Sequence, residues 1–162
     1  MLRVGLISDT HGLLRPEAVE FLRGSNFIVH AGDICEPKIL SGLNALAPVT
    51  AVRGNNDQGP WAKDLRTGEF LRIGAVTIYV IHDIADLNID LTSAGIRVVV
   101  SGHSHKPHIE ERNGVLFVNP GSAGQRRFRL PIAAAELLVE GESVTARITE
   151  LVNQNAPMAE KD

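Results

Sequence analysis

Five apolar segments of this chain each end in a short polar loop whose side chains are of the kinds that bind metal ions. The first segment, Leu2 to Ile7, runs directly into Ser8-Asp9-Thr10-His11-Gly12. The other four loops are Gly32-Asp33, Gly54-Asn55-Asn56-Asp57, His82-Asp83 and Gly102-His103-Ser104-His105. A fold that accommodates this pattern has to bring five strand ends together, and we predict that the five loops meet at one site.

Strands and helices are predicted to alternate over the first third of the chain. Apolar residues at helical spacing over 15–23 and 36–46, each with a proline in the first turn, separate strands at 2–7, 27–29 and 49–52. This βαβαβ order predicts a parallel sheet. Ligands of such sheets collect beyond the carboxyl ends of the strands, where the first three polar loops lie.

The rest of the chain is predicted to be mostly β. A helix is expected over 86–94, ended by Gly95. Strands are expected at 69–73, 76–81, 98–100, 109–112, 115–118, 132–139 and 144–151. These elements predict one domain over residues 1–151, made of two packed sheets with helices outside, and a frayed tail over residues 152–162.

The composition of the chain limits which partners it can bind and indicates the cellular compartment. A net charge of −3 over 162 residues gives no signal for electrostatic wrapping of nucleic acid. The chain has no pattern of a signal peptide and no apolar stretch long enough to span a bilayer, so we expect no membrane partner. Cys35 is the only cysteine, which excludes an internal disulfide and favours a cytoplasmic location. For Cys35, packing near the site is favoured over a catalytic thiol, because no dedicated base accompanies it.

The donor types narrow the choice of metal. Carboxylate and amide oxygens combined with imidazole suit Mn, Fe or Zn, whereas copper(I) and iron–sulfur clusters require thiolates. Each motif alone occurs often by chance, and the specificity lies in their order at successive strand ends.

Taken together, these motifs resemble the calcineurin-like metallophosphoesterases. Within that superfamily the chain is most similar to the small prokaryotic phosphodiesterases, which are related to the retromer scaffold subunit of eukaryotes. The resemblance implies an α+β or α/β fold, a four-layer αββα sandwich of two mixed sheets flanked by helices. It is carried by Ser8-Asp9-Thr10-His11-Gly12, His30-Ala31-Gly32-Asp33, Val52-Arg53-Gly54-Asn55, Gly102-His103-Ser104-His105 and Asn119-Pro120-Gly121-Ser122.

The same resemblance implies a centre of two divalent metal ions, with Mn²⁺ as first choice and Fe, Zn or Ni as alternatives. One ion would be held by Asp9, His11, Asp33 and His105, and the other by Asp33, Asn55, His82 and His103. Asp33 would bridge the ions, and the Asn55 amide could also orient the substrate phosphate. A water shared by the metals would have a lowered pKa, and the resulting hydroxide would attack phosphorus in line.

Two positions depart from the family's pattern. Asn56 stands where a histidine is common, and an amide can donate a hydrogen bond to phosphate but cannot supply a proton. Asn56 is thus a candidate substrate ligand and a weak catalytic candidate, and we expect slow turnover that favours good leaving groups. Asp83 stands where a glycine is usual. It could orient a ligand, protonate the leaving group, or simply face solvent.

Some nearby residues have simpler interpretations. His30 is expected to be packed and not a ligand. The basic run Arg126, Arg127 and Arg129 is interpreted as a solvated face in preference to a grip on the second arm of the substrate. For Trp61, lining the substrate cleft and packing against the domain stay equally open.

The leading functional hypothesis is a metal-dependent phosphodiesterase that acts on a small phosphoester. One alternative is a metal-binding interaction scaffold with little or no turnover, and another is a phosphomonoesterase. Monoesterases typically present more basic groups to the extra charge, which favours the diester. A homodimer could form through an exposed apolar strand edge.

Overall fold

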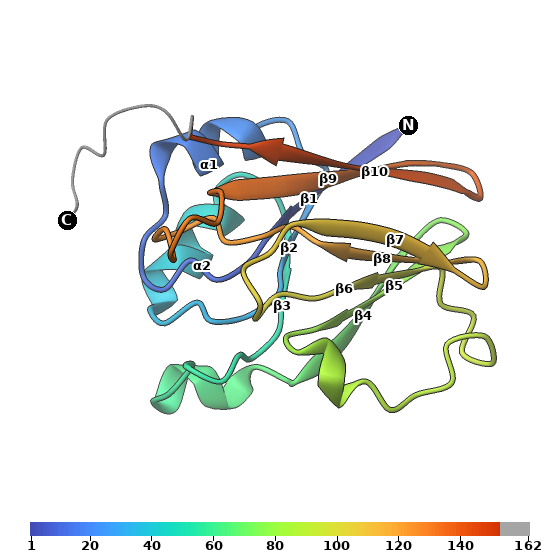
Figure 1. The fold of residues 1–162 in the computed structure, drawn as a ribbon, viewed down its shortest axis with the longest axis horizontal. Helices are drawn as coiled ribbons and strands as arrows, with labels where there is room; N and C mark the ends of the chain where they lie inside the picture. Colours follow the sequence, from blue (N-terminus) through green and yellow to red (C-terminus); the bar gives the residue numbers. More distant parts are fainter. Residues whose placement is uncertain (153–162) are drawn as a thin grey trace.

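Two five-stranded sheets lie face to face in this protein (Figure 1). A computed structural model describes residues 1–152, so the predicted tail over 152–162 lies outside the described residues except for its first position. The strand orders are β10-β9-β1-β2-β3 and β4-β5-β6-β8-β7. The two mixed sheets are those expected from the sequence.

The first sheet is built on the predicted βαβαβ unit. β1, β2 and β3 run parallel, and the helices α1 and α2 connect them. The hairpin of β9 and β10 continues the sheet antiparallel to β1. The elements are β1 (Leu2–Ile7), α1 (Pro16–Leu22), β2 (Phe27–His30), α2 (Pro37–Asn44), β3 (Val49–Ala51), β9 (Ala133–Glu140) and β10 (Ser143–Glu150).

The second sheet contains a parallel trio flanked by antiparallel edge strands. β5, β6 and β8 run parallel, while β4 and β7 pair antiparallel with β5 and β8. The elements are β4 (Gly68–Ile73), β5 (Val76–Ile81), β6 (Val98–Val100), β7 (His108–Arg112) and β8 (Val115–Asn119), with the short 3₁₀ helices η1 (Pro60–Asp64) and η2 (Ile84–Asp86) before β4 and after β5.

The main core fills the space between the sheets. Alternate residues of each strand point inward, so Leu6 of β1 packs in the same cluster as Val80 of β5 and Val100 of β6. A second cluster lies under the helices, where Leu22 of α1 and Leu43 of α2 are fully buried. Trp61 belongs to this second cluster as a partly buried member, which favours its packing interpretation.

The outer face of the second sheet is covered by an irregular segment. The predicted helix over 86–94 is wrong: only the turn η2 forms, followed by a single turn in which the Ala94 amide donates to the Asp90 carbonyl. The Asp90 side chain accepts from the Ser93 amide and hydroxyl, a local pattern that competes with helix formation. Ile89 and Leu91 still reach the sheet and cover it.

Parallel strands of both sheets end at the same side of the molecule. β1, β2 and β3 deliver Asp9, Asp33 and Asn55, and β5 and β6 deliver His82 and His103, so the five loops converge as predicted. No helix among residues 1–152 is long and apolar enough to cross a membrane.

Candidate metal centre

The site loops turn through backbone conformations that side chains rarely adopt. Six non-glycine residues here have positive φ, namely Asp9 (56°), His11 (47°), Asp33 (60°), Cys35 (73°), His103 (73°) and His105 (64°). Each such residue costs on the order of 1–3 kcal/mol and persists only where the surroundings hold it. The chain is therefore bent sharply at the positions that present its ligand-type side chains.

Two glycines let these loops approach one another. A methyl group at Gly54 would overlap the Asp33 carboxylate, and one at Gly102 would lie 2.7 Å from Asp9 Oδ2 and overlap the Ser8 hydroxyl. Glycine at these two positions therefore permits the close approach of the loops.

Asp9, His11 and His105 form the first group of converging donors. The fully buried Asp9 places Oδ1 3.4 Å from His105 Nε2 and 3.8 Å from His11 Nε2. Among the described residues, Asp9 Oδ1, His11 Nε2 and His105 Nδ1 are buried without a hydrogen-bond partner. Buried polar atoms are normally satisfied, so these unmatched ligand-type atoms fit a bound cation.

Asp33 and His82 form a second group with Asp9. Asp33 Oδ2 lies 3.4 Å from His82 Nε2 and 3.6 Å from His11 Nε2, which places this oxygen between the two groups. His82 donates from Nδ1 to the Ala31 carbonyl at 2.7 Å, and this bond turns Nε2 toward the carboxylates. Asp33 Oδ2 thus faces one imidazole of each group, Asp9 is the residue that both groups share, and the bridging role of Asp33 stays a prediction.

Asn55 and His103 lie at the outer side of this group. Asn55 Oδ1 is 2.9 Å from His82 Nε2 and 3.2 Å from His103 Nδ1. Asp83 Oδ2 lies 3.7 Å from His103 Nε2, while its Oδ1 accepts the Ala85 amide at 3.0 Å and caps η2. The seven predicted ligands therefore lie together, and Asp83 faces one of them.

Asn56 contacts Asp33. Its backbone amide donates to Asp33 Oδ1 at 2.8 Å and its side-chain amide donates to Asp33 Oδ2 at 3.0 Å. Burial alone would raise the pKa of Asp33, but hydrogen bonds from His82 and Asn56 outweigh it and hold that pKa well below its usual range. Asn56 thus helps to keep Asp33 ionised, and its predicted contact with substrate stays a prediction.

Asp57 has a function at the site that our sequence reasoning did not assign. Its buried carboxylate accepts backbone amides from Asp33 (3.0 Å), Gly54 (2.7 Å), Ile34 (2.8 Å) and Cys35 (2.8 Å). It ties the loop after β3 to the loop after β2. The position of Asp57, two residues after Asn55, was visible in the sequence, but acceptance of backbone amides has no signature in residue type.

His30 is packed as expected, whereas Cys35 is only partly buried and lines the smaller cavity. His30 is fully buried, accepts the Gly32 amide at Nδ1 and donates from Nε2 to the Thr10 hydroxyl; burial lowers its pKa to about 3, so it is neutral. Burial, and then the nearby carboxylates, raise the pKa of the Cys35 thiol to about 11. Its sulfur lies 3.7 Å from His11 Nδ1 and stays protonated at neutral pH.

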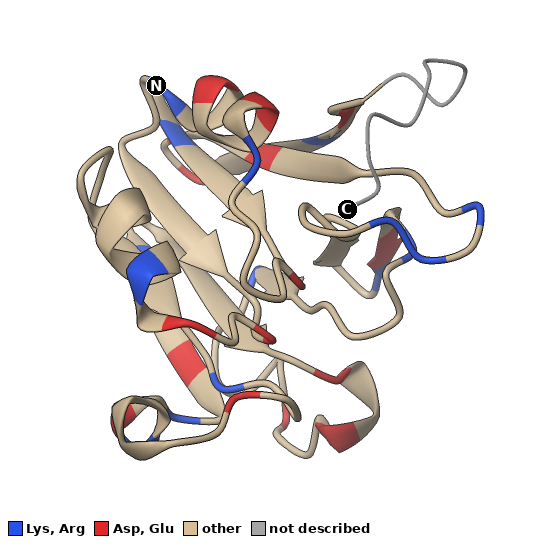
Figure 2. Ribbon diagram, turned by 90° about the vertical axis from the view of Figure 1, so that its left-hand side faces the viewer, with Lys and Arg blue, Asp and Glu red and all other residues tan. Residues whose placement is uncertain are grey.

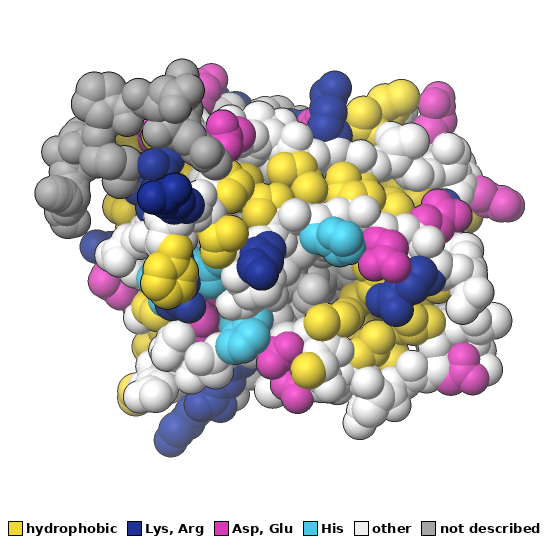
Figure 3. All heavy atoms as spheres, viewed as in Figure 1, with side chains coloured by type: hydrophobic (Ala, Val, Ile, Leu, Met, Phe, Trp, Pro, Cys, Tyr) yellow, Lys and Arg dark blue, Asp and Glu magenta, His cyan; other side chains and the backbone are white. Residues whose placement is uncertain are grey.

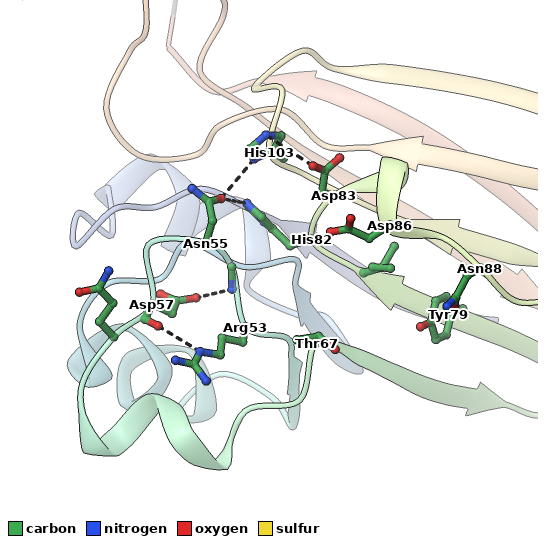
Figure 4. A pocket seen from close by; sticks show the side chains of 13 residues that line it. Arg53, Asn55, Asp57, Thr67, Tyr79, His82, Asp83, Asp86, Asn88 and His103 are labelled. Carbon is green, nitrogen blue, oxygen red and sulfur yellow. Dashed lines mark hydrogen bonds and ion pairs between the residues drawn. The ribbon is translucent and has the colours of Figure 1, made fainter.

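Two cavities flank the converging donors. The larger, of about 610 Å³, is entered past Asn55, His82 and His103 and includes Asp83 and Asp86 in its lining (Figure 4). The smaller, of about 450 Å³, lies on the other side against His11 and His105. A ligand bound at the centre could extend in both directions.

The donor set fits a divalent cation. Two carboxylates converge with imidazoles and an amide oxygen, the mixture of hard oxygen and nitrogen donors that Mn, Fe and Zn accept. The buried, unmatched Asp9 Oδ1 would be destabilising without a positive partner.

Known proteins are similar to this chain in sequence or in fold. A curated probable metallophosphoesterase of Methanothermobacter thermautotrophicus is 35% identical, over 96% of this chain and 94% of that protein. A phosphodiesterase of Methanocaldococcus jannaschii is 28% identical, over 74% and 83% of the two chains. The solved structure of Vacuolar Protein Sorting 29 from Cryptosporidium parvum superposes with a TM-score of 0.81 at 22% identity, over 95% and 93% of the chains, and shows the same fold.

A family model decides the assignment. The model of the calcineurin-like phosphoesterase superfamily domain matches residues 2–142, which include all the converging loops. The resemblance inferred from the motifs is thereby confirmed, together with the fold that it implied. This chain belongs to the calcineurin-like phosphoesterase superfamily.

Proposed function

We propose that this protein hydrolyses phosphodiesters with two divalent metal ions, Mn²⁺ being the first choice and Fe, Zn or Ni the alternatives. One ion would be held by Asp9, His11, Asp33 and His105, and the other by Asp33, Asn55, His82 and His103. The observation that carries the proposal is the buried Asp9 Oδ1, which faces two imidazoles and accepts no hydrogen bond from any described residue.

The bound ions would supply positive charge against the phosphoryl oxygens and lower the pKa of a water. The chain itself has to fix the carboxylates in their ionised form and in one orientation. The two amides of Asn56 do this for Asp33. The Ser8 hydroxyl and the His103 backbone amide donate to Asp9 Oδ2 at 2.7 and 3.1 Å. Ala31 fixes the tautomer of His82 through its carbonyl.

The surroundings favour a diester over a monoester. Asp83 and Asp86 line the larger cavity beside the donors, and they disfavour a second negative charge on that side of the phosphorus. A diester carries one negative charge at phosphorus and a monoester carries nearly two. The neutral amide of Asn56 supplies no proton to a leaving group, so good leaving groups should react fastest.

We place the reaction in the cytoplasm, since Cys35 is the only cysteine and a reducing compartment is where such chains are typical.

The test is hydrolysis of bis(4-nitrophenyl) phosphate by metal-stripped protein, with and without Mn²⁺, while bound metal is counted by mass spectrometry. We expect turnover only with metal, two ions per chain, and loss of both in Asp33→Asn. Bis-ester hydrolysis should exceed that of 4-nitrophenyl phosphate. If the protein binds two ions but shows no turnover, the proposed enzymatic activity is wrong and the scaffold alternative is favoured. If Asp33→Asn leaves turnover and metal content unchanged, the proposed two-metal centre is wrong.

A further inference from the structure

The loop between β8 and β9 carries bulky side chains that the proposed reaction does not use. Two of its arginines, Arg126 and Arg127, line the smaller cavity beside His11 and His105. In Figure 2 the blue segments of this loop stand at the right, above the red segments near the lower edge. The residues concerned are Arg126, Arg127, Phe128 and Arg129.

The base of this loop is attached to the metal-binding loop after β1. The Ser122 hydroxyl donates to the Asp9 carbonyl at 3.1 Å, and Arg15 Nε donates to the Gly124 carbonyl at 2.7 Å. Gly124 packs so tightly on the backbone of Thr10 that a methyl group there would overlap it. The side chains that follow are thus held beside the donors by backbone contacts.

Arg127 lines the cavity, and the next residue, Phe128, presents its ring to solvent. The Arg127 guanidinium lines the cavity and forms no hydrogen bond or ion pair with any residue in the described range 1–152. Phe128 is 88% exposed, at a backbone φ of 55°. Burying a phenylalanine is worth about 1.5–3 kcal/mol, so the chain forgoes that gain here. A guanidinium in the cavity, followed in the same loop by an exposed aromatic ring, fits a ligand that carries both a phosphate and a planar ring.

The opposite cavity has the opposite charge. Asp83 and Asp86 point toward it, with the hydroxyl-bearing Tyr79 and the amide of Asn88 further along (Figure 4). These groups suit an uncharged arm that forms hydrogen bonds. The two arms of a diester bound at the centre would therefore meet different surroundings.

We propose that the substrate is a nucleotide-type diester whose arm on the Arg127 side carries a second phosphate and a planar base, while the arm on the Asp83 side is uncharged. The inference rests on the proposed function and names its substrate class. Arg127 would bind the second phosphate and Phe128 would stack on the base. The recognition is local, since the face in Figure 3 mixes cations with acids and has no continuous basic tract.

The test uses three diesters that share the 4-nitrophenolate leaving group: methyl 4-nitrophenyl phosphate, thymidine 5′-(4-nitrophenyl phosphate), and the latter with a 3′-phosphate. In each, the oxygen of water bonds to phosphorus, the bond to the aryl oxygen breaks, and a proton goes to solvent. The third substrate yields thymidine 3′,5′-bisphosphate. Ratios of kcat/KM taken within one preparation cancel differences in metal content.

We expect the 3′-phosphate to raise kcat/KM about tenfold or more, the effect of one charge-assisted hydrogen bond. In Arg127→Ala, the ratio of kcat/KM with the 3′-phosphate to kcat/KM without it should be close to one. Phe128→Ala should lower the ratio of the thymidine ester to the methyl ester severalfold. Arg129→Ala is the matched control, because it removes the same charge from the same loop but does not line the cavity. Binding of thymidine 3′,5′-bisphosphate, measured by calorimetry, should weaken by a similar factor in Arg127→Ala and not in Arg129→Ala.

The outcomes separate the two proposals. If the methyl ester and bis(4-nitrophenyl) phosphate are not hydrolysed by metal-loaded protein, the proposed function fails. If they are hydrolysed but the 3′-phosphate gives no advantage, or an advantage that Arg127→Ala leaves unchanged, the substrate class is wrong and the phosphodiesterase stands.

Discussion

Asp57 accepts the backbone amide of Asp33 at 3.0 Å, so a residue at the middle of the candidate metal centre is held by a carboxylate that is not among the seven predicted ligands. The same carboxylate holds the amide of Gly54, at the end of the neighbouring strand, at 2.7 Å. The spacing between the loops after β2 and β3 is therefore set by one buried side chain. Asp57 is 1% exposed, which keeps water from competing for these bonds.

The Asp57→Asn variant should destabilise the fold by about 3 kcal/mol, because an amide group replaces one carboxylate oxygen and faces two backbone donors. Urea unfolding measures this change, and metal titration should show weaker binding. Asp64→Asn is the control, since Asp64 is exposed in η1. Equal stability of the two variants would show that the bonds of Asp57 contribute little.

Asn56→His should restore a proton donor beside the centre. The backbone amide of Asn56 still binds Asp33 Oδ1 in this variant, so the carboxylate keeps one of its two anchors. Phenolate is a poor leaving group and nitrophenolate a good one. We expect the ratio of the hydrolysis rate of diphenyl phosphate to that of bis(4-nitrophenyl) phosphate to be about tenfold higher in Asn56→His than in wild type. Steady-state rates on the two esters give the ratio, and Asn56→Ala serves as comparison. A ratio that is the same in both variants and wild type would mean that leaving-group protonation is not limiting.

Metal removal should lower the melting temperature of the protein. Ions that bind only the folded state stabilise it by about 4 kcal/mol at a thousandfold excess over Kd, and removing them leaves Asp9 and Asp33 facing each other's charge. Differential scanning calorimetry of stripped and Mn²⁺-loaded protein measures the difference, which Asp33→Asn should reduce. Glu142→Gln, in the exposed β9–β10 turn, should keep the full shift. If Mn²⁺ left the melting temperature unchanged, the proposal that these residues bind metal ions would be contradicted.

Glu136, which lies in β9 away from the candidate metal centre, should make the free energy of unfolding depend on pH. Burial alone would raise its pKa, but Arg3 at 2.6 Å and Arg147 at 2.7 Å outweigh burial and lower the pKa from its ordinary 4.5. Stability from this group is therefore present above about pH 4.5 and is lost as the pH falls through the lower folded pKa. Urea unfolding between pH 3 and 7 should show a steeper acid loss in wild type than in Glu136→Gln. Glu140→Gln, at the exposed end of β9, should behave as wild type.

The arrangement of the loops was predictable because it follows from strand direction. Asp9, Asp33 and Asn55 each follow a strand of a parallel unit, and parallel strands end at one edge. The helix predicted over 86–94 failed because Asp90 binds Ser93 locally, an interaction that periodicity does not register.

Roles that depend on orientation could not be predicted. The sequence places Asn56 next to Asn55 but does not show that its amide turns to Asp33. It shows a basic run at Arg126 and Arg127, but the cavity beside them arises only when the loop is fixed against the strand-end loop of β1.

The left-handed backbone at the site has an evolutionary consequence. Asp9, Asp33 and His105 are bent into conformations that glycine adopts without strain. A descendant of this chain released from metal chemistry could therefore gain conformational stability by exchanging these ligands for glycine, and selection for a robust scaffold would erode them.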